Sequence, residues 1–338
     1  MSDMKDRRAD AVFFGFDFQV NAAIVLMLEN IKELQSLRLE GNCEDIELTL
    51  ANSKKILAQA KAVVNSSSDF SHVRGNLKKA LLSLSDGERK ADTQQLILIT
   101  NSPNPFNDDE SRGAFWGPAH RAFIDLPPSA QKIVEGYLSQ IEHPLDCQKF
   151  MVQVLPFETD NETERYKAVL QVINDFVGSL NTNITHGLGK RIWQIWHCDI
   201  FTNGSKKDAA ITLTKKSIIW PILVIETDVT HCDNDFLEQL DVCIYDEVVR
   251  LYKETIDSCC ERIDFFTRVL FDFNEFPSSK RQSEKSIDFV NSAWENYKAE
   301  FAVDKIDAET LEALTKVILF NILRRRIVID RVRQGVNL

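Results

Sequence analysis

The chain has 338 residues, of which 44% are hydrophobic, and this length and composition predict a globular protein of one large or two smaller domains. Its formal net charge of −11 argues against a protein that coats nucleic acid non-specifically. The first residues carry charges on both sides of a short apolar patch and lack the features of a signal peptide. No run of about eighteen apolar residues occurs, so we expect a cytoplasmic protein without a membrane span.

The seven cysteines also fit a reducing compartment. They form no CxxC pair, and an odd number at irregular spacings is a poor framework for disulfides. We expect most of them to be buried thiols.

The first hundred residues alternate between helical and strand-like patterns. Residues 18–37 repeat apolar side chains at helical spacing, and three short strand-like segments follow at 36–41, 45–50 and 56–61. Residues 72–84 predict a second helix, and the aliphatic run at 94–102 predicts a buried strand. The order helix, three strands, helix, strand predicts a compact α/β core.

The chain then becomes polar and loop-like over residues 101–118. Helices are expected around residues 129–141 and 162–180, with a strand at 149–157 between them. We place a domain boundary near Pro221, which gives a first domain over residues 1–220 with its core at 10–105, and a second over 221–338. The second domain is helical by pattern at 233–271, 286–301 and 307–332, with Asp307 as an N-cap, and we expect it to serve interaction or regulation.

Charge is distributed unevenly between these two regions. Residues 1–220 carry 25 basic and 28 acidic side chains, a net charge of −3, whereas residues 221–338 carry 15 and 23, a net charge of −8. Basic side chains in the first region are numerous enough to form a positive stripe that could contact phosphates. The candidates for DNA contact are Lys54, Lys55, Arg74, Lys78 and Lys79.

The second and third strand-like segments suggest a catalytic site. If they pair as an antiparallel hairpin, Asp45 at the start of one approaches Gln59 and Lys61 at the end of the other. Converging carboxylate and amide oxygens can hold Mg²⁺ or Mn²⁺, and a neighbouring lysine can orient or deprotonate water and stabilise phosphate charge. For Glu40, Glu44, Glu47 and Lys61, a solvent-exposed strand face is the alternative.

This arrangement resembles the PD-(D/E)XK nuclease superfamily, whose core carries an Asp and then an (E/Q)-x-K tripeptide on a three-stranded meander between two helices. Here these would be Asp45 and Gln59-Ala60-Lys61. GFDFQ before a long helix, LEGNCEDIEL, the AQAK strand and the LITNS strand are similar to the double-stranded-DNA endonuclease domain of CD-NTase-associated antiphage effectors. The similarity is greatest to the nuclease subunit of Lamassu-type, SMC-associated defence systems, because residues 221–338 do not resemble a SAVED sensor domain.

The resemblance implies a metal-dependent endonuclease that cuts double-stranded DNA as the effector of an antiphage system. It implies Mg²⁺ or Mn²⁺ bound by Asp45, Gln59 and Glu40, with Glu44 competing with Glu40. It also implies an SMC-type ATPase and a small accessory subunit as partners, inhibition until release, and a homo-oligomer when active. The alternative is a non-catalytic, nuclease-like scaffold that binds a partner through its acidic helical region.

Other patterns carry weaker hypotheses. The tripeptide HCD occurs at 197–199 and at 231–233, and two His/Cys pairs could bind zinc. Trp193, Trp196 and Trp220 could stack on bases, although a core position is the usual alternative. Residues 324–326 are three consecutive arginines inside an apolar helix, which could contact DNA or an acidic partner or lie on a solvated face.

Overall fold

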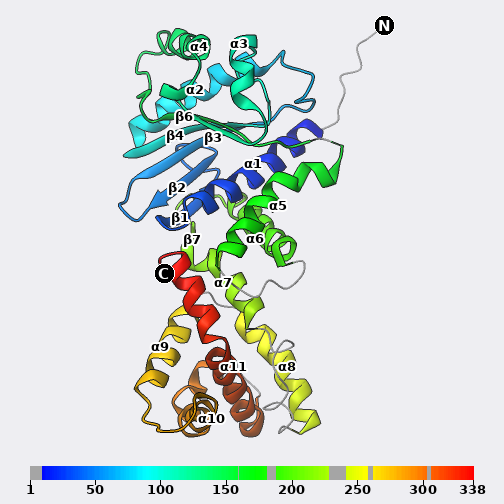
Figure 1. Cartoon of the computed structure of the whole chain (residues 1–338), viewed down its shortest axis with the longest axis vertical. Coiled ribbons are helices and arrows are strands. Elements are labelled where there is room, and N and C mark those ends of the chain that lie inside the picture. The colour runs from blue at the N-terminus through cyan, green and yellow to red at the C-terminus, as the bar shows by residue number, and fades with distance from the viewer. Residues whose placement is uncertain (1–9, 159, 181–187, 228–240, 258–261, 303–305) are drawn as a thin grey trace. The chain divides into compact units, whose positions relative to one another are not determined.

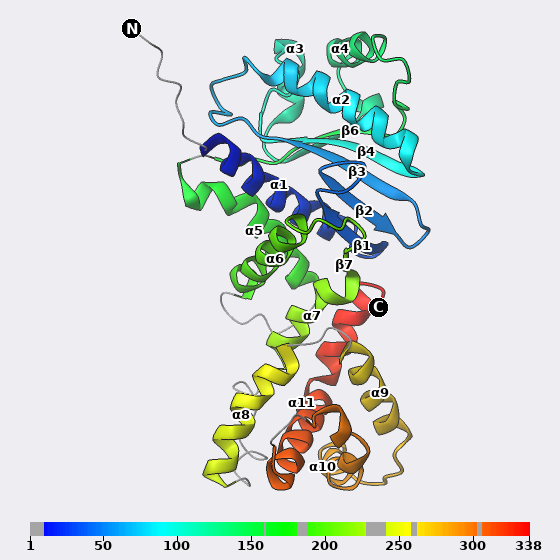
Figure 2. The same cartoon turned by 180° about the vertical axis from the view of Figure 1, so that it is seen from behind.

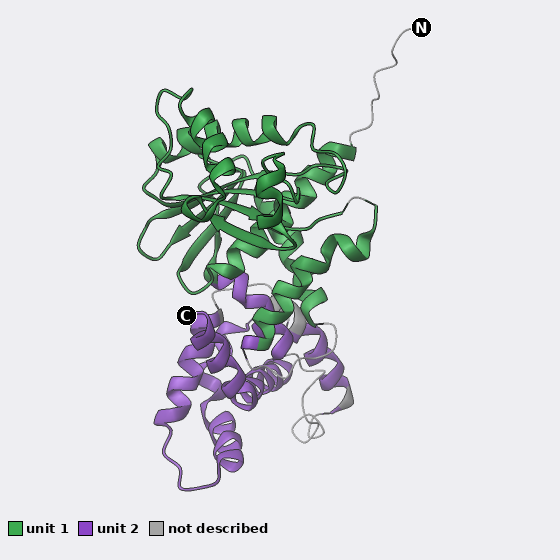
Figure 3. Cartoon of the chain, turned by 45° about the horizontal axis from the view of Figure 1, so that its top comes forward, with its two compact units in different colours: residues 1–178, 184–215 green, residues 179–183, 216–338 purple. Residues whose placement is uncertain are grey.

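The structure, a computed structural model, describes residues 10–158, 160–180, 188–227, 241–257, 262–302 and 306–338. The chain forms two compact units, shown in Figure 3. Unit 1 comprises residues 1–178 and 184–215, and unit 2 comprises residues 179–183 and 216–338. The boundary that we expected after residue 220 lies within helix α7 (Lys215–Glu226), which continues through Pro221.

Unit 1 is built on a seven-stranded mixed sheet with the order β5-β6-β4-β3-β2-β1-β7. Strands β1, β2 and β3 form an antiparallel meander, and β3, β4 and β6 run parallel to one another. Both edge strands are short and antiparallel to their neighbours. The strand bounds are β1 Leu34–Leu39, β2 Ile46–Leu50, β3 Lys55–Lys61, β4 Thr93–Thr100, β5 Ala119–Ala122, β6 Phe150–Val154 and β7 Leu213–Thr214.

The predicted order of the core elements is confirmed, because α1 (Asp10–Glu29) precedes the meander and α2 (Val73–Lys90) connects β3 to the parallel strand β4. The protein is therefore α/β in unit 1, with a helical C-terminal region. Figures 1 and 2 show α1 on one face of the sheet and α2 on the other. The α1 face is also covered by α5 (Glu162–Ser179) and α6 (Leu188–Gly204).

Helix α1 begins and ends earlier than we predicted. It starts at Asp10, so the GFDFQ segment lies inside the helix and not before it, and the last residues of our predicted helix form β1 instead. Phe14 and Phe18 pack against Phe157, which keeps the early turns of the helix in the core. Among the described residues, only α1 has the length and apolar composition of a membrane span, and 67% of that window is buried within the protein.

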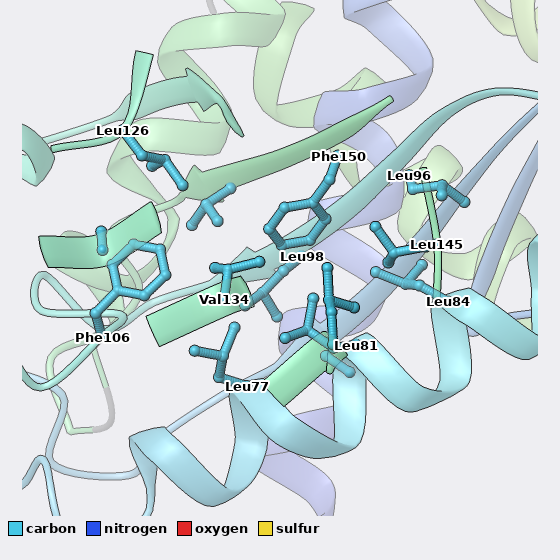
Figure 4. Close-up of a cluster of buried hydrophobic side chains, with 14 of the residues drawn as sticks. Leu77, Leu81, Leu84, Leu96, Leu98, Phe106, Leu126, Val134, Leu145 and Phe150 are labelled. Carbon is cyan, nitrogen blue, oxygen red and sulfur yellow. The ribbon is translucent and has the colours of Figure 1, made fainter. Parts of the chain in front are cut away.

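The α2 face of the sheet contains the core cluster shown in Figure 4. Alternate residues of β3, β4 and β6 point to this face, among them Leu57, Leu98 and Phe150. They pack against Leu81 of α2 and Val134 of α4 (Pro128–Leu138). By the alternation of a strand, Gln59 and Lys61 share the face of Leu57, whereas Ala60 faces α1.

Four elements of unit 1 were not predicted. The polar segment contains the single-turn helix α3 (Asp109–Arg112) and leads into β5, while α6 and β7 lie in the region before the expected boundary. Both strands are too short to show an alternating pattern, since β5 has four residues and β7 has two. The expected strand at 149–157 and the helices at 129–141 and 162–180 are confirmed as β6, α4 and α5.

Unit 2 is helical in its described parts, as the sequence predicts. Its helices after α7 are α8 (Val242–Asp257), α9 (Arg262–Glu275), α10 (Gln282–Ala293) and α11 (Ala308–Gly335). Asp307 caps α11 by accepting hydrogen bonds from the backbone N–H groups of Glu309 and Thr310, which confirms the predicted N-cap. Residues 324–326 lie in α11, where the guanidinium of Arg326 donates to the carbonyl of Leu323.

Our expectation of buried thiols was wrong for the cysteines that the structure describes. Cys198 and Cys243 are exposed, and Cys43 and Cys147 are half-buried, all as free thiols. The other three cysteines, and the HCD tripeptide at 231–233, lie outside the described residues.

Candidate active site

The loop between β1 and β2, residues 40–45, positions the acidic side chains of the site. Glu40 adopts a left-handed backbone conformation with φ of 53°. Its N–H donates to the carbonyl of Asp45 at 2.8 Å, and the N–H of Gly41 donates to the carbonyl of Glu44 at 3.0 Å. This double closure makes a compact turn that places Glu40 and Asp45 at the same end of the hairpin.

The side chain of Glu47, on β2, holds this loop in place through hydrogen bonds. Its carboxylate accepts hydrogen bonds from the backbone N–H of Cys43 at 2.6 Å and of Glu44 at 3.3 Å. It also forms an ion pair with Lys55 at 2.7 Å. A Cβ atom on Gly41 would lie 2.1 Å from Oε1 of Glu47, so the packed loop requires glycine at this position. Glu47 is therefore a buried structural residue, and the solvent-face alternative that we considered for it was wrong.

Asp45 meets the predicted residues of β3. Because Ile46 pairs with Ala58, the next position across the hairpin brings Asp45 opposite Gln59. Oδ2 of Asp45 accepts hydrogen bonds from the Gln59 amide and from the N–H of Ala60 at 3.1 Å. Nζ of Lys61 lies 3.7 Å from the same oxygen. The structure thus brings Asp45, Gln59 and Lys61 together, with Gln59 buried and the other two side chains partly exposed.

A residue that the sequence did not reveal, Gln19, holds the Glu40 side chain beside Asp45. Gln19, a buried residue of α1, donates from Nε2 to Oε1 of Glu40 at 2.7 Å and to the carbonyl of Asp45 at 3.2 Å. Gln19 is the last residue of the GFDFQ segment. Its amide links α1 to the loop, so the position of the Glu40 carboxylate depends on the placement of α1.

Burial dominates the electrostatics of both acidic residues beside the loop. Desolvation raises the pKa of Asp45 above its usual value, and the charge of Lys61 and the N–H of Ala60 only partly offset this. Desolvation also raises the pKa of Glu44 to about 7, against the opposing effect of Ser83 nearby. Both oxygens of Glu44 are buried without a hydrogen bond of good geometry, so the solvent-face alternative was wrong for Glu44 as well.

Only a few residues of the site supply oxygen atoms that could bind a hard cation. Within the described residues, no group of three or more His, Cys, Asp and Glu side chains is placed to hold a metal ion. Here the donors are the carboxylates of Asp45 and Glu40 and the amide oxygen of Gln59, if its amide is rotated. Mg²⁺ usually retains several waters and needs only one or two carboxylates. The donor set therefore fits Mg²⁺ or Mn²⁺, with Asp45 Oδ1 as the oxygen not used by its three neighbours.

The predicted DNA-contact residues divide into two groups. Lys54 and Lys55 stand at the start of β3, about 20 Å along the strand from Lys61, and Lys55 is paired with Glu47. Lys54 and Lys55 therefore lie at the opposite end of β3 from Asp45 and Lys61.

The other three candidates lie on α2, which returns antiparallel to β3 and so begins near Lys61. Arg74 donates to the carbonyl of Asn107 at 3.3 Å and Lys78 donates to Gln140 at 3.1 Å. Lys79 is exposed and lies one turn before Ser83, the neighbour of Glu44. Of these three candidates, Lys79 lies nearest along α2 to Ser83.

A second polar cluster of unit 1 surrounds Asp17 of α1 and connects α1 to α5 and α6. Nε2 of His197 lies 3.0 Å from Oδ1 of Asp17, and the Tyr166 hydroxyl donates to Oδ2 at 2.9 Å. Trp193 donates to Asn21 at 2.8 Å and its ring lies beside those of Tyr166 and His197. His197 is thus engaged with a carboxylate, which does not support our zinc hypothesis.

Two of the three tryptophans considered for base stacking lie in the core. Trp196 and Trp220 are buried in their respective units, so the stacking hypothesis was wrong for both. Trp193 is half-buried within the Asp17 cluster.

No protein-family model matches the chain, and no curated protein or solved structure matches it either.

Proposed function

We propose that the protein is a metal-dependent endonuclease that hydrolyses phosphodiester bonds of double-stranded DNA. The observation that carries the proposal is the convergence of Asp45, Gln59 and Lys61 at one end of the β2–β3 hairpin. This convergence occurs on a helix–meander–helix–strand core whose order is that of the PD-(D/E)XK nucleases. Asp45 combines partial burial with an unshared oxygen, which favours a ligand-binding role.

Each residue has a distinct role in this proposal. Asp45 and Glu40 hold Mg²⁺ or Mn²⁺, which supplies charge stabilisation at the scissile phosphate. Gln19 fixes the Glu40 carboxylate, and Gln59 positions Asp45 through its amide. The amino group of Lys61 stabilises the negative charge that develops on the phosphoryl oxygens as water forms the new P–O bond and the bridging oxygen leaves. Lys79, and then Arg74 and Lys78, contact the DNA backbone beside the site.

Regulation forms part of the same proposal. An endonuclease that cuts cellular DNA continuously is toxic, so a defence effector must be held inactive until it is needed. The net charge of −8 over residues 221–338 repels DNA and favours a basic protein surface as the partner. We propose that partner proteins, an SMC-type ATPase and a small accessory subunit, restrain the cytoplasmic enzyme through unit 2. Release then permits a homo-oligomer whose paired sites cut both strands.

Plasmid cleavage with matched lysine variants tests the activity. Lys61→Ala should reduce cleavage about a hundred- to a thousandfold, since a single electrostatic group at a transition state contributes this much. Lys149→Ala is the matched control, because Lys149 is also partly exposed and paired with a carboxylate, Glu88, but lies before β6 at the opposite end of the parallel strands. The assay follows supercoiled DNA over rising protein concentrations in Mg²⁺, Mn²⁺ and EDTA.

Three results would contradict the proposal: equal cleavage by wild type and Lys61→Ala, cleavage that survives EDTA, or no cleavage by wild type at any concentration with either metal. The last result would favour the non-catalytic scaffold, in which the Asp45–Lys61 ion pair only stabilises the hairpin. For the regulation, the mass of the assembly and its cleavage are measured with and without partners. A monomer that cuts both strands at full rate when bound to its partners would exclude gating.

A further inference from the structure

Three side chains from different elements of unit 1 meet on the α1 face of the sheet. Glu29 ends α1, His120 lies on β5, and Gln153 lies opposite His120 on β6. Both strand residues point to the α1 face, because their neighbours Ala119 and Val154 belong to the core of the opposite face. This cluster is therefore separated by the sheet from the face of Gln59 and Lys61.

The three terminal donor atoms form a nearly equilateral triangle. Nε2 of His120 lies 3.2 Å from Oε1 of Glu29, and the Gln153 amide nitrogen lies 3.1 Å from the same oxygen. The Gln153 nitrogen lies 3.2 Å from Nε2 of His120. Ligands of a metal with bonds of about 2.05 Å lie about 2.9 Å apart in an octahedron and about 3.3 Å apart in a tetrahedron. The triangle falls between these two edge lengths.

The hydrogen bonding of the triangle leaves one edge without a hydrogen when Gln153 donates to both of its neighbours. The Gln153 amide can donate one hydrogen to Glu29 and the other to His120. The remaining edge joins a carboxylate oxygen to an imidazole nitrogen, and two acceptors at this distance need a proton or a metal ion between them. With the amide in this orientation, either a proton or a metal ion between Glu29 and His120 completes the triangle.

Gln153 provides a second indication. Its side chain is 2% exposed, and its Oε1 is buried without a hydrogen-bond partner in the described parts of the chain. Rotation of the amide by 180° directs this oxygen into the triangle, where it is the third ligand of a metal ion. The side chains of His120 and Glu29 are 43% and 30% exposed, so waters can complete the coordination sphere.

We propose that Glu29, His120 and Gln153 bind a divalent transition metal ion such as Zn²⁺. Imidazole and carboxylate ligands suit such an ion, whereas Mg²⁺ prefers oxygen ligands alone. The ion links α1 to β6 and to the edge strand β5, which is four residues long and pairs with β6 alone. Its role is structural, and it does not depend on the proposed endonuclease activity.

Cobalt titration of the full chain tests the site. Co²⁺ is added in the presence of excess Mg²⁺, which occupies oxygen-only sites, and binding is followed by visible absorption and calorimetry. We expect one bound Co²⁺ that Zn²⁺ displaces. His120→Gln should weaken binding at least about tenfold, and Gln153→Met should weaken it as well. His143→Gln is the matched control, because His143 is also exposed beside a glutamate, Glu142, and should bind as wild type does.

Hydrogen exchange supplies a readout that needs no activity. Zn²⁺ should slow amide exchange in residues 119–122 of wild type and leave exchange in His120→Gln unchanged. Because His120 is partly exposed, this variant should fold, and a far-UV spectrum equal to that of wild type establishes that it does. No Co²⁺ binding by wild type at millimolar metal, or equal affinity of wild type and His120→Gln, would overturn the proposal. Slowed exchange in both proteins would overturn it too.

Discussion

Asp17 and Asp45 are both partly buried carboxylates of unit 1, with side chains 18% and 26% exposed. They differ in how their oxygens are used. Both oxygens of Asp17 are occupied: Asn21 donates to Oδ1 at 3.0 Å, where His197 also lies, and Tyr166 donates to Oδ2. The contacts of Asp45 all converge on Oδ2.

The difference separates a structural carboxylate from one suited to a ligand. A saturated carboxylate stabilises the fold because each donor is satisfied by it, and removing the charge leaves buried donors unpaired. In a carboxylate with one unshared oxygen, hydrogen bonds and ion pairs offset only part of the cost of burying the charge. A bound cation offsets the rest. Substitution of Asp17 should therefore cost much more stability than substitution of Asp45.

Asp17→Asn should produce the largest loss of stability. The amide replaces an oxygen acceptor with a donor that faces Tyr166 and Arg165, whose guanidinium lies 3.5 Å from Oδ2. We expect the free energy of unfolding to fall by about 2–4 kcal/mol. Urea denaturation measures it, with Asp175→Asn as the control, because Asp175 is exposed on α5. If both variants unfold at the same urea concentration, Asp17 does not hold the helices together.

Glu44 extends the comparison to a buried carboxylate whose oxygens form no hydrogen bond of good geometry within the described residues. Its pKa is raised from 4.5 to about 7, so the folded state binds a proton more tightly than the unfolded state. Its contribution to stability is therefore present below pH 4.5 and is lost as the pH rises to about 7. Glu44→Gln should remove this loss and stabilise the protein at pH 8 by on the order of 2 kcal/mol.

The measurement for Glu44 is urea denaturation of wild type and variant between pH 4 and pH 8. The two curves of unfolding free energy against pH should converge at the acidic end and separate above it. Glu88→Gln is a poor control because Glu88 pairs with Lys149, whereas the exposed Glu142 offers a suitable one. Parallel curves for wild type and Glu44→Gln would show that Glu44 is not buried as a carboxylate.

The sequence was sufficient to predict the parts of the site that follow from strand periodicity. Alternation along β3 places Gln59 and Lys61 on one face, and a short hairpin turn fixes Asp45 opposite them. It could not reveal Gln19, because the contact of Gln19 with Glu40 depends on where α1 begins and how it crosses the sheet. Nor could it reveal the burial of Glu47, which depends on a loop with a left-handed residue at Glu40.

The triangle of Glu29, His120 and Gln153 could not be predicted from the sequence either, because it depends on the tertiary arrangement. Its residues are separated along the chain, and β5 is too short to show a periodic pattern. Zinc motifs are recognised in a sequence by closely spaced His and Cys residues. The HCD tripeptides therefore suggested a zinc site, whereas the isolated His120 did not. Local spacing therefore predicted the site within one hairpin, and missed the cluster that only the order of strands brings together.

Gly41 tests whether the loop itself holds Asp45 in place. A Cβ at Gly41 would overlap the Glu47 carboxylate, so Gly41→Ala must displace either Glu47 or the loop. We expect a loss of about 1–2 kcal/mol of stability together with weaker Mn²⁺ binding at Asp45. Gly136→Ala is the control, since no atom lies within 4 Å of a Cβ built there. Calorimetric titration with Mn²⁺ and urea denaturation give the two values, and unchanged Mn²⁺ affinity would mean that the loop does not position Asp45.

Asp45→Asn is the counterpart of Asp17→Asn, and its effect on stability should be the smallest. Because burial raises the pKa of Asp45, ionised Asp45 weakens the folded state as the pH rises above its unfolded pKa, near 3.8. The neutral amide removes this cost but also loses the attraction to Lys61 and part of the hydrogen bonding from Gln59 and Ala60. These effects oppose one another, so at pH 7 we expect a change in unfolding free energy within about 1 kcal/mol.

Metal binding should respond differently to Asp45→Asn. Mn²⁺ loses its charged ligand, so its affinity should fall at least about tenfold. A large loss of stability with unchanged Mn²⁺ affinity would make Asp45 a structural carboxylate like Asp17, and the proposed active site would then lose its central residue.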